Sequence, residues 1–419
     1  MNGGALIIGA SQAGVQLAVS LRDKGYDEPI TLIGAESQPP YQRPPLSKAF
    51  LSGSADITTL QLRTKAFYAA QRIDLAPAER VTNLRLSDSG PRGSGTALTD
   101  QGRTLEFDRL ALTVGARPRR LDVPGCDLEG VCYLRAVDDA VRLRSHLTRA
   151  RDVVVIGGGF IGLEAAAVAR SEDKNVIVVE AADRLISRSV APVVSEFYRQ
   201  AHIRRGTQVR LGAEVAGIRG ARGHVTGVRL EDGTVLPADV VVVGVGITPR
   251  TELAEQLGLH CDGGIVVDEF ARTSEQSVVA AGDCTVLPNP QSGEGMVRLE
   301  SVPNAVSQAR VAAATLAGSP QPYTDVPWNW SDQYDLKLQI AGATNGFDEH
   351  LVRGDPDSER FSVMYYRQGE LQAINAVNMA PDYLAARKAL ASGTPLPADR
   401  AVVPGLSLKD LLLEGAAAR

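Results

Sequence analysis

Two glycine-rich turns in separate halves of the chain constrain its fold more than any other feature. The first runs from Gly9 to Gly14 and the second from Gly157 to Gly162. Each follows a short apolar run, opens a segment with helical spacing, and leads to a second apolar run that ends near an acid. This strand–turn–helix–strand order is typical of dinucleotide-binding units, in which glycines let the backbone approach a pyrophosphate at a helix N-terminus.

The acids after the two units are Glu36 and Glu180, whose carboxylates can accept hydrogen bonds from ribose hydroxyls. Ser11 stands where the first turn would normally carry its second glycine, which weakens that motif without abolishing it because serine is small. The second turn is complete. Two such units in one chain predict two bound dinucleotides, and therefore an enzyme that holds FAD and uses NADH.

Glu180 also favours NADH over NADPH, because a carboxylate accepts a free 2′-hydroxyl and repels a 2′-phosphate. Arg184 and Arg188 follow it and could attract that phosphate, or they could be solvated charges. The remaining residues expected to contact NADH are those of the second turn, Arg188, and the glycine turn after a later buried strand: Gly157, Gly159, Phe160, Ile161, Gly162, Arg188 and Gly246.

Composition excludes several classes of protein. A chain of 419 residues suggests two or three domains, and the formal charge of −5 offers no basic surface for nucleic acid. No apolar run approaches the roughly 20 residues of a membrane span. Because the first strand begins almost at the N-terminus, we expect no signal peptide and a cytoplasmic location. No cluster of metal-ligand residues is recognisable, so no metal site is expected.

The four cysteines argue against disulfide chemistry. None forms a Cys-x-x-Cys pair, and the stretch 39–48, where many flavin disulfide reductases carry their redox-active cysteines, contains none. We therefore expect ordinary thiols in a reducing compartment, and electrons that leave the flavin directly.

A weak internal duplication organises the first three quarters of the chain. Each half runs through a glycine-rich turn, a meander and a buried strand to a second glycine turn, at 113–115 and 244–246, where the chain is expected to cross between domains. From Pro322 the sequence changes to alternating strands with Gly and Asp turns, which predicts a separate α+β domain of about a hundred residues.

Two further segments fit an FAD site. The run ending in Gly282-Asp283 predicts a strand that delivers a carboxylate to a tight turn, where it can accept a hydrogen bond from a ribityl hydroxyl. The helix after Ser301 carries Val302 and Pro303 in its first turn. Its positive end could stabilise the negative charge that develops on a reduced flavin, although a plain surface helix would look the same.

Lys48 and Glu164 are the expected catalytic pair. Glu164 lies inside the helix of the second unit between apolar neighbours, where an unpaired carboxylate would be costly to bury. An ion pair with Lys48 across a domain interface would remove that cost and would lie where nicotinamide meets flavin. The alternative is that Glu164 belongs to the solvated face of its helix.

These motifs together resemble the FAD-dependent ferredoxin reductases of bacterial oxygenase systems. The resemblance rests on both glycine turns, Pro44-Pro-Leu-Ser-Lys48, Gly282-Asp283, Ser301-Val-Pro-Asn304 and Trp330-Ser-Asp-Gln-Tyr334, and it covers nearly the whole chain. It implies an α/β, glutathione-reductase-like fold with two Rossmann-type domains and a C-terminal α+β interface domain. The implied boundaries are 1–110 with 245–320 for FAD, 111–244 for NAD, and 321–419 for the C-terminal domain.

The resemblance also implies particular flavin contacts. Besides the first turn with Gly9 and Gly14, they are Ala13, Glu36, Arg43, Lys48, Val81, Arg135, Asp283 and Val302. One departure is Ala35, at a position where relatives often carry an acid, so ribose binding would fall to Glu36.

Three functions are compatible with these features. The first is electron transfer from NADH through FAD to a 2Fe-2S ferredoxin that serves a haem monooxygenase or a ring-hydroxylating dioxygenase, with Trp330 near the electron path. The second is an NADH oxidase or monodehydroascorbate-like reductase with a small acceptor. The third is a slow FAD- and NADH-binding interaction protein. In each case we expect a monomer or weak homodimer without nucleic-acid or membrane partners.

Overall fold

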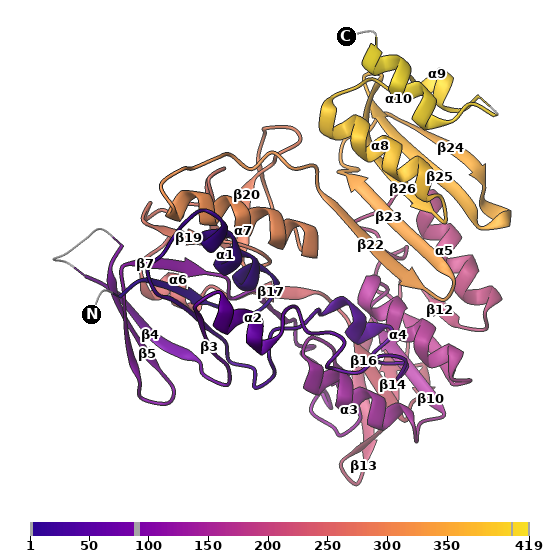
Figure 1. The fold of residues 1–419 in the computed structure, drawn as a ribbon. Helices are drawn as coiled ribbons and strands as arrows, with labels where there is room; N and C mark the ends of the chain where they lie inside the picture. The colour runs from indigo at the N-terminus through magenta and orange to yellow at the C-terminus, as the bar shows by residue number, and fades with distance from the viewer. Residues whose placement is uncertain (1–2, 88–92, 404, 418–419) are drawn as a thin grey trace. The chain divides into compact units, whose positions relative to one another are not determined.

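The computed structural model describes residues 3–87, 93–403 and 405–417 (Figure 1). Its contacts divide the chain into two compact units. Unit 1 consists of Met1–Gln42, Ile57–Arg117 and Ile247–Pro327. Unit 2 consists of Arg43–Asp56, Pro118–Gly246 and Trp328–Arg419.

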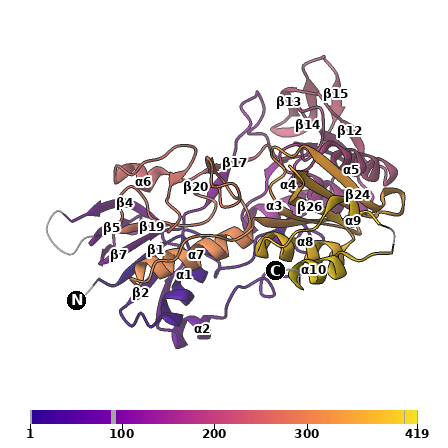
Figure 2. The same cartoon turned by 90° about the horizontal axis from the view of Figure 1, so that it is seen from above.

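Unit 1 is built on a five-stranded parallel sheet. In spatial order its strands are β19 (Val278–Ala280), β7 (Arg109–Leu112), β1 (Ala5–Ile8), β2 (Ile30–Ile33) and β3 (Ile73–Ala76). The central strand β1 is buried throughout, and β7 is buried after its first residue, Arg109, as a parallel sheet covered on both faces requires. Helices α1 (Gln12–Asp23) and α7 (Val302–Leu316) lie side by side over this sheet (Figures 1 and 2) and share one apolar core with it.

Smaller elements complete unit 1. They are the antiparallel sheet β4 (Val81–Leu86), β5 (Gly95–Thr99) and β6 (Thr104–Phe107), the pair β8 (Ala116–Pro118) and β17 (Ile247–Pro249), the sheet β18 (Ile265–Val266), β20 (Thr285–Pro288) and β21 (Met296–Val297), and helices α2 (Lys65–Ala70) and α6 (Glu252–Gln256).

Unit 2 contains a second five-stranded parallel sheet. Its spatial order is β12 (Gln208–Arg210), β11 (Asn175–Val179), β10 (Asp152–Ile156), β16 (Val240–Val243) and β9 (Val131–Tyr133). Helices α3 (Val137–Leu147), α4 (Phe160–Ser171) and α5 (Pro192–Arg204) accompany it, with an antiparallel sheet of β13 (Val215–Ala221), β14 (His224–Leu230) and β15 (Val235–Pro237). The two parallel sheets confirm the predicted α/β class.

The C-terminal part of unit 2 is an antiparallel sheet covered by helices. The sheet runs β22 (Trp328–Gln333), β23 (Leu336–Gly342), β26 (Glu370–Val377), β25 (Arg360–Arg367) and β24 (Glu349–Asp355), with the 3-10 turn η2 (Pro356–Ser358) before β25. Helices α8 (Ala380–Ser392), α9 (Ala398–Ala401) and α10 (Leu408–Ala417) close its core (Figure 1). This is the predicted α+β domain, although its pattern did not reveal β24 or the three helices.

The proline-rich stretch forms a short 3-10 helix, η1 (Pro44–Ser47), which Pro44 and Pro45 initiate. The contacts also group Arg43–Asp56 with unit 2, beside the second glycine turn. The three-domain boundaries themselves stay a prediction.

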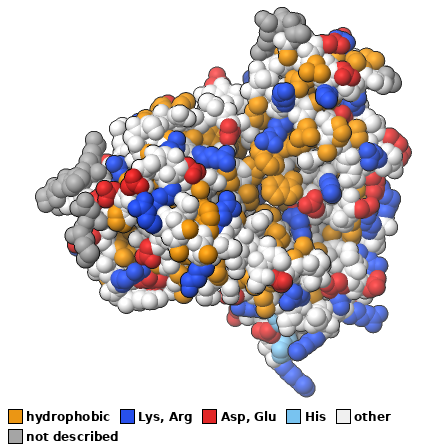
Figure 3. Space-filling view, in the orientation of Figure 1, with side chains coloured by type: hydrophobic (Ala, Val, Ile, Leu, Met, Phe, Trp, Pro, Cys, Tyr) orange, Lys and Arg blue, Asp and Glu red, His pale blue; other side chains and the backbone are white. Residues whose placement is uncertain are grey.

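Surface charge is mixed in sign. On the face drawn in Figure 3, basic and acidic side chains are interspersed over both units, as the small net charge of −5 suggests. Within the described ranges, no helix has the length and apolarity needed to cross a bilayer.

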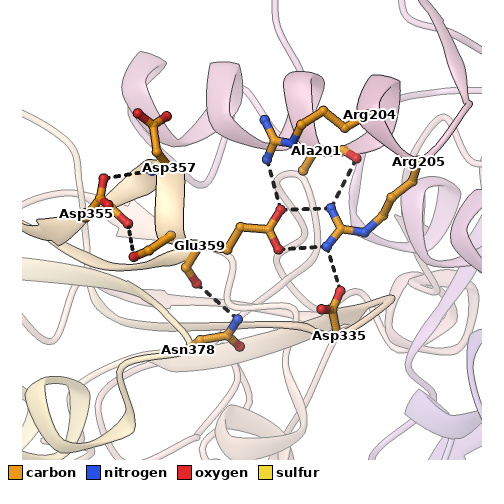
Figure 4. A network of polar contacts seen from close by, with 9 residues as sticks. Ala201, Arg204, Arg205, Asp335, Asp355, Asp357, Glu359 and Asn378 are labelled. Carbon is orange, nitrogen blue, oxygen red and sulfur yellow. Dashed lines mark hydrogen bonds and ion pairs between the residues drawn. The ribbon is translucent and has the colours of Figure 1, made fainter.

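A charge network ties α5 to the C-terminal sheet inside unit 2 (Figure 4). The Arg205 guanidinium donates to both carboxylate oxygens of Glu359, at 2.9 and 2.7 Å, and to Asp335 at 2.7 Å. Arg204 donates to Glu359 as well, at 2.9 Å. The bidentate bond from Arg205, which is the largest cause, lowers the pKa of Glu359 to about 2.

This network should make stability depend on acid pH. Because the folded-state pKa of Glu359 lies below its ordinary value of 4.5, its contribution is present above about pH 4.5 and is lost as the pH falls through about 2. Glu359→Gln should lower the unfolding free energy at neutral pH by roughly 1–2 kcal/mol, since the site is partly exposed. In urea titrations, the difference in unfolding free energy between Glu359→Gln and the parent should shrink as the pH falls from 4.5 toward 2. Glu196→Gln, in an exposed pair with Arg199, is the matched control and should change little.

Candidate functional site

The first glycine turn connects β1 to α1 in a way that only glycine permits. Gly9 has a φ of 118°, and a Cβ there would lie 2.1 Å from the carbonyl oxygen of Thr113. A Cβ on Gly14 would lie 2.1 Å from the oxygen of Gly9. Ser11 is the N-cap of α1, and its side chain makes no capping bond. Serine at this position is therefore compatible with the turn, as expected.

The other unit 1 residues predicted to hold FAD lie at the ends of neighbouring elements. Glu36 follows β2 and accepts a hydrogen bond from the hydroxyl of Tyr41, so its carboxylate has a fixed orientation. Val81 is the buried first residue of β4.

Three elements converge at Gly282. A Cβ there would lie 3.2 Å from the Cβ of Ala13 in α1 and 3.7 Å from that of Ala305 in α7, so the turn that carries Asp283 meets the starts of both helices. The backbone N–H of Gly282 donates to Gln308 Oε1 at 2.8 Å. This convergence places Asp283 beside two helix N-termini, which suits a phosphate-bearing cofactor.

Helix α7 begins as predicted. Ser301 is its N-cap and accepts the N–H of Asn304 at 3.2 Å, with Pro303 in the first turn. Two buried polar atoms on this helix, Asn304 Oδ1 and Gln308 Nε2, have no hydrogen-bond partner in the described part of the chain. Because buried polar groups are normally paired, these atoms fit a site that takes a polar ligand such as FAD.

The glycines of the second turn differ in their surroundings: Gly157 and Gly162 pack against the backbone, whereas Gly159 borders open space. Gly157 has a φ of 106°, and Cβ atoms on Gly157 and Gly162 would lie 2.4 and 2.2 Å from backbone oxygens. A Cβ on Gly159, the N-cap of α4, would have no neighbour within 4 Å among the residues that the structure describes. Phe160 and Ile161 form the first turn of that helix. The space above Gly159 is where a pyrophosphate can approach the helix N-terminus.

Glu180 lies directly after β11 and braces this turn. Its carboxylate accepts the backbone N–H of Gly158 at 2.6 Å and that of Ala182 at 2.8 Å. A carboxylate has about four acceptor positions, so ribose hydroxyls can still bind to it. Arg188 is exposed, with its guanidinium 3.8 Å from where a Cβ on Gly246 would lie.

Arg184 has a structural role that the sequence did not reveal. Its guanidinium donates to the carbonyl oxygens of Val190 and Ser187, both at 2.6 Å, and to Ser195 Oγ at 3.1 Å. These three bonds and the half-buried position show that Arg184 is not a solvated charge. Because a guanidinium carries five N–H donors, its attraction for a 2′-phosphate stays a prediction.

Lys48 and Glu164 form a buried ion pair. Lys48 Nζ lies 2.8 Å from Glu164 Oε2, and the side chains are 18% and 4% exposed. The interpretation of Glu164 as a solvated helix residue is thus wrong. Both residues belong to unit 2 by their contacts. Since the three-domain boundaries stay a prediction, so does the placement of the pair across a domain interface.

Two serines that sequence reasoning missed complete the coordination of Glu164. Ser47 donates to Oε2, and Ser331 in β22 donates to Oε1 at 2.6 Å. The apolar neighbours of Glu164 in sequence gave no sign of these two hydroxyls, because the serines come from segments distant along the chain. Ser331 lies next to Trp330 in a motif noted in the sequence, but nothing in the sequence indicated that its hydroxyl points toward Glu164.

The remaining predicted residues of unit 2 lie nearby in the chain. Arg43 Nη1 donates to the carbonyl oxygen of Arg135 at 2.9 Å, which ties η1 to the segment before α3. Trp330 lies in β22 with its ring centroid 5.7 Å from that of Trp328, partly exposed.

The cysteines are free thiols. Cys132 and Cys284 are buried, and burial raises the pKa of each thiol to about 12, so neither is a thiolate at neutral pH. Among the described residues, no group of three or more His, Cys, Asp or Glu side chains could hold a metal ion. That the chain binds no metal stays an expectation.

Comparison with known proteins decides the family. Residues 5–309 match the model of the pyridine nucleotide-disulphide oxidoreductases, and residues 328–412 match that of a reductase C-terminal domain. The chain belongs to the pyridine nucleotide-disulphide oxidoreductase family. It is an oxidoreductase that uses FAD and a pyridine nucleotide, and the predicted fold is confirmed.

Within this family the chain groups with the ferredoxin reductases, as the sequence motifs predicted. It is 45% identical to rhodocoxin reductase from Rhodococcus erythropolis over 96% of this chain and 93% of that protein. A solved ferredoxin reductase from Rhodopseudomonas palustris is 42% identical, with a TM-score of 0.93 over 98% of this chain and 99% of the other. Putidaredoxin reductase, solved in a covalent complex with putidaredoxin, is 37% identical, with a TM-score of 0.93 over 99% of both chains.

Proposed function

We propose that this enzyme passes electrons from NADH, through FAD, to a 2Fe-2S ferredoxin that serves a haem monooxygenase or a ring-hydroxylating dioxygenase. The observation that carries the proposal is the buried Lys48–Glu164 pair, because a charged pair with this many hydrogen bonds is typical of a working site. Putidaredoxin in the complex of a relative supports a ferredoxin as the acceptor.

FAD, when bound, accepts two electrons at once and releases them singly, which an iron–sulfur acceptor requires. We assign its pyrophosphate to the first glycine turn and the N-terminus of α1, and a ribityl hydroxyl to Asp283. The positive N-terminal end of α7 at Val302 would stabilise negative charge on the flavin.

Residues of unit 2 would bind and orient the nicotinamide nucleotide. The open space at Gly159 would hold its pyrophosphate, and Glu180 its ribose. Two of the three N–H donors of Lys48 serve Glu164 and the carbonyl oxygen of Pro44, so the third can donate to a cofactor. The ion pair would thereby fix a positive charge at the site of hydride transfer.

The other acceptors weighed from the sequence are less well supported. A peroxidase or disulfide reductase needs a thiolate, and burial holds the Cys132 and Cys284 thiols protonated. A small acceptor stays a distinct hypothesis. A relative adds a rubredoxin to the candidates, since rubredoxin-NAD(+) reductase of Pseudomonas putida is 37% identical over 89% of this chain. We also propose a cytoplasmic location, which four free thiols favour, and a monomer or weak homodimer.

Steady-state assays can separate these acceptors. The flavin-loaded enzyme should reduce a 2Fe-2S ferredoxin with NADH much faster than it reduces oxygen or monodehydroascorbate. Ferricyanide, which takes electrons from the flavin without a protein docking site, is the control. A ferredoxin rate no higher than the oxygen rate would contradict the proposal, and a higher rate with rubredoxin would reassign the acceptor.

Glu180 should determine the choice between NADH and NADPH. Glu180→Ala should narrow the preference for NADH in kcat/KM by about tenfold or more, because the repulsion of a 2′-phosphate disappears. Arg188→Ala provides the comparison. Because the exposed Arg188 cation near Gly246 would attract a 2′-phosphate, its loss should increase the preference for NADH. Equal use of both nucleotides by the parent enzyme would contradict the role of Glu180.

Trp330 is expected to affect only the transfer to ferredoxin. Trp330→Leu should lower the rate of ferredoxin reduction several-fold and leave the ferricyanide rate unchanged. Trp328→Leu is the matched control, because the two rings are neighbours on one strand. An equal loss with both acceptors would assign Trp330 to packing.

A further inference from the structure

A chain of hydrogen bonds leads away from Glu164 through buried side chains of unit 2. Gln333 Nε2 lies 3.1 Å from Ser331 Oγ, which donates to Glu164. Gln333 Oε1 lies 2.9 Å from His202 Nε2, and His202 Nδ1 lies 3.5 Å from the hydroxyl of Tyr334. Ser331, Gln333 and His202 are fully buried.

The elements that supply these residues explain their alignment. Ser331 and Gln333 are two apart in β22 and so lie on one face of the strand. His202 comes from α5, and Tyr334 stands in the two-residue turn after β22 with a φ of 56°. A non-glycine residue in this conformation is strained, and here the strain accompanies a hydroxyl placed between His202 and Thr207, whose Oγ1 is 3.1 Å away.

The charge of Glu164 fixes the direction of every bond in the chain. An ionised carboxylate only accepts, so Ser331 donates to it and receives the amide N–H of Gln333. The amide oxygen of Gln333 then faces His202, which requires a proton on Nε2. His202 Nδ1 is left as an acceptor for Tyr334. All donors thus point toward Glu164, an arrangement in which each bond strengthens the next.

We propose that Gln333 and His202 are positioning residues, which act through Ser331 to hold the Glu164 carboxylate directed at Lys48. This inference rests on the proposed role of Glu164 in flavin reduction. An imidazole buried as completely as His202 could instead fill space, but a space-filling residue would not need one particular tautomer. Burial, the largest cause, lowers the pKa of His202 to about 4, so it is neutral at physiological pH.

The tautomer of His202 provides a test that needs no turnover. In protein labelled with ¹⁵N at its five histidines, the His202 signals, assigned with His202→Asn, should show the Nε2–H tautomer. In Glu164→Gln, Lys48 and Ser47 still require an acceptor, so the amide oxygen faces them and its N–H faces Ser331. Each bond then reverses, and His202 should change to the Nδ1–H tautomer. An Nδ1–H tautomer in the parent, or no change in Glu164→Gln, would overturn the proposal.

Stopped-flow reduction by NADH provides the second test. Gln333→Met keeps the side-chain volume but cannot donate to Ser331, and it should slow flavin reduction about fivefold, the effect of one lost hydrogen bond, without weakening NADH binding. The matched control is Asn375→Leu, a buried amide in β26 whose oxygen accepts from the hydroxyl of Tyr365 and not from a member of this chain of bonds. An unchanged rate in Gln333→Met, or an equal loss in the control, would overturn the positioning role.

The two tests distinguish the positioning role of Gln333 and His202 from the proposed role of Glu164 in flavin reduction. If Glu164→Gln slows reduction while Gln333→Met does not, the proposed function stands and the positioning role fails. If Glu164→Gln leaves the rate unchanged, the role of Glu164 itself fails, whatever tautomer is found. Should Gln333→Met not fold, His202→Leu, which cannot donate to Gln333, replaces it in the stopped-flow test, and an unchanged rate of flavin reduction would contradict the positioning role.

Discussion

Glu164→Gln is expected to slow the reduction of the flavin by NADH by about two orders of magnitude, the loss that misplacing a reacting group by about 1 Å can cause. The variant keeps the shape of the carboxylate and at least one acceptor for Lys48 and Ser47. What it removes is the charge that holds the ammonium in place. Stopped-flow absorbance at the flavin band measures the rate, and FAD content should be unchanged.

Lys48→Met should slow the same step and also destabilise the fold. It leaves a carboxylate that is 4% exposed without its cation, and removing one member of a buried pair costs about 3–5 kcal/mol. The double variant Lys48→Met with Glu164→Gln should regain part of that stability, because no charge stays buried, but should stay slow. Recovery of rate and stability together would show that the pair is structural.

A matched ion pair elsewhere gives the control. Glu79 is 8% exposed and bonds to Arg103 at 2.6 Å in unit 1. Glu79→Gln removes a buried carboxylate of similar exposure, so it should lower stability without slowing flavin reduction. If its rate falls as far as that of Glu164→Gln, the loss reflects general destabilisation and not the chemistry of the site.

The buried strands, the glycine turns and the start of α7 could be predicted from the sequence, because each depends on a few consecutive residues. The apolar runs at 5–8 and 153–156 became central parallel strands because such runs suit only a doubly covered sheet. Glycines that the turns require, such as Gly9 and Gly157, were recognisable because the backbone admits no other residue there. Ser301 and Pro303 indicated the start of α7, because an N-cap serine and a first-turn proline are typical of helix N-termini.

Contacts between distant segments could not be predicted in this way. The serines around Glu164 come from η1 and β22, and no periodicity indicates which strand face meets which helix. Arg184 has the same spacing from Glu180 whether it is a solvated charge or donates to the carbonyl oxygens of Ser187 and Val190, so only the folded loop distinguishes these roles. The helices after β26 were missed because Gly- and Pro-containing connections obscured their short apolar faces.

Gly159→Asp is expected to change NADH binding and stability in opposite directions. Gly159 is the N-cap of α4 in extended conformation, and a Cβ there would meet none of the described atoms within 4 Å. Aspartate is a favoured N-cap residue and complements the positive helix end, so the unfolding free energy should rise by a few tenths of a kcal/mol. The same carboxylate would occupy the space proposed for the pyrophosphate and repel it.

Binding of NADH should therefore weaken by about two orders of magnitude or more, from the lost helix-terminus site and the added like charge. Gly159→Ala separates the two causes, since it fills the space without charge and should weaken binding less. Gly217→Ala in β13, where a Cβ would have only ordinary contacts at 3.5 Å, is the control for a methyl group added in the same unit. Titration of NADH by calorimetry gives the affinity and urea unfolding the stability. If Gly159→Asp binds NADH as the parent does, the pyrophosphate does not lie at this helix end, and the second glycine turn has only a structural role.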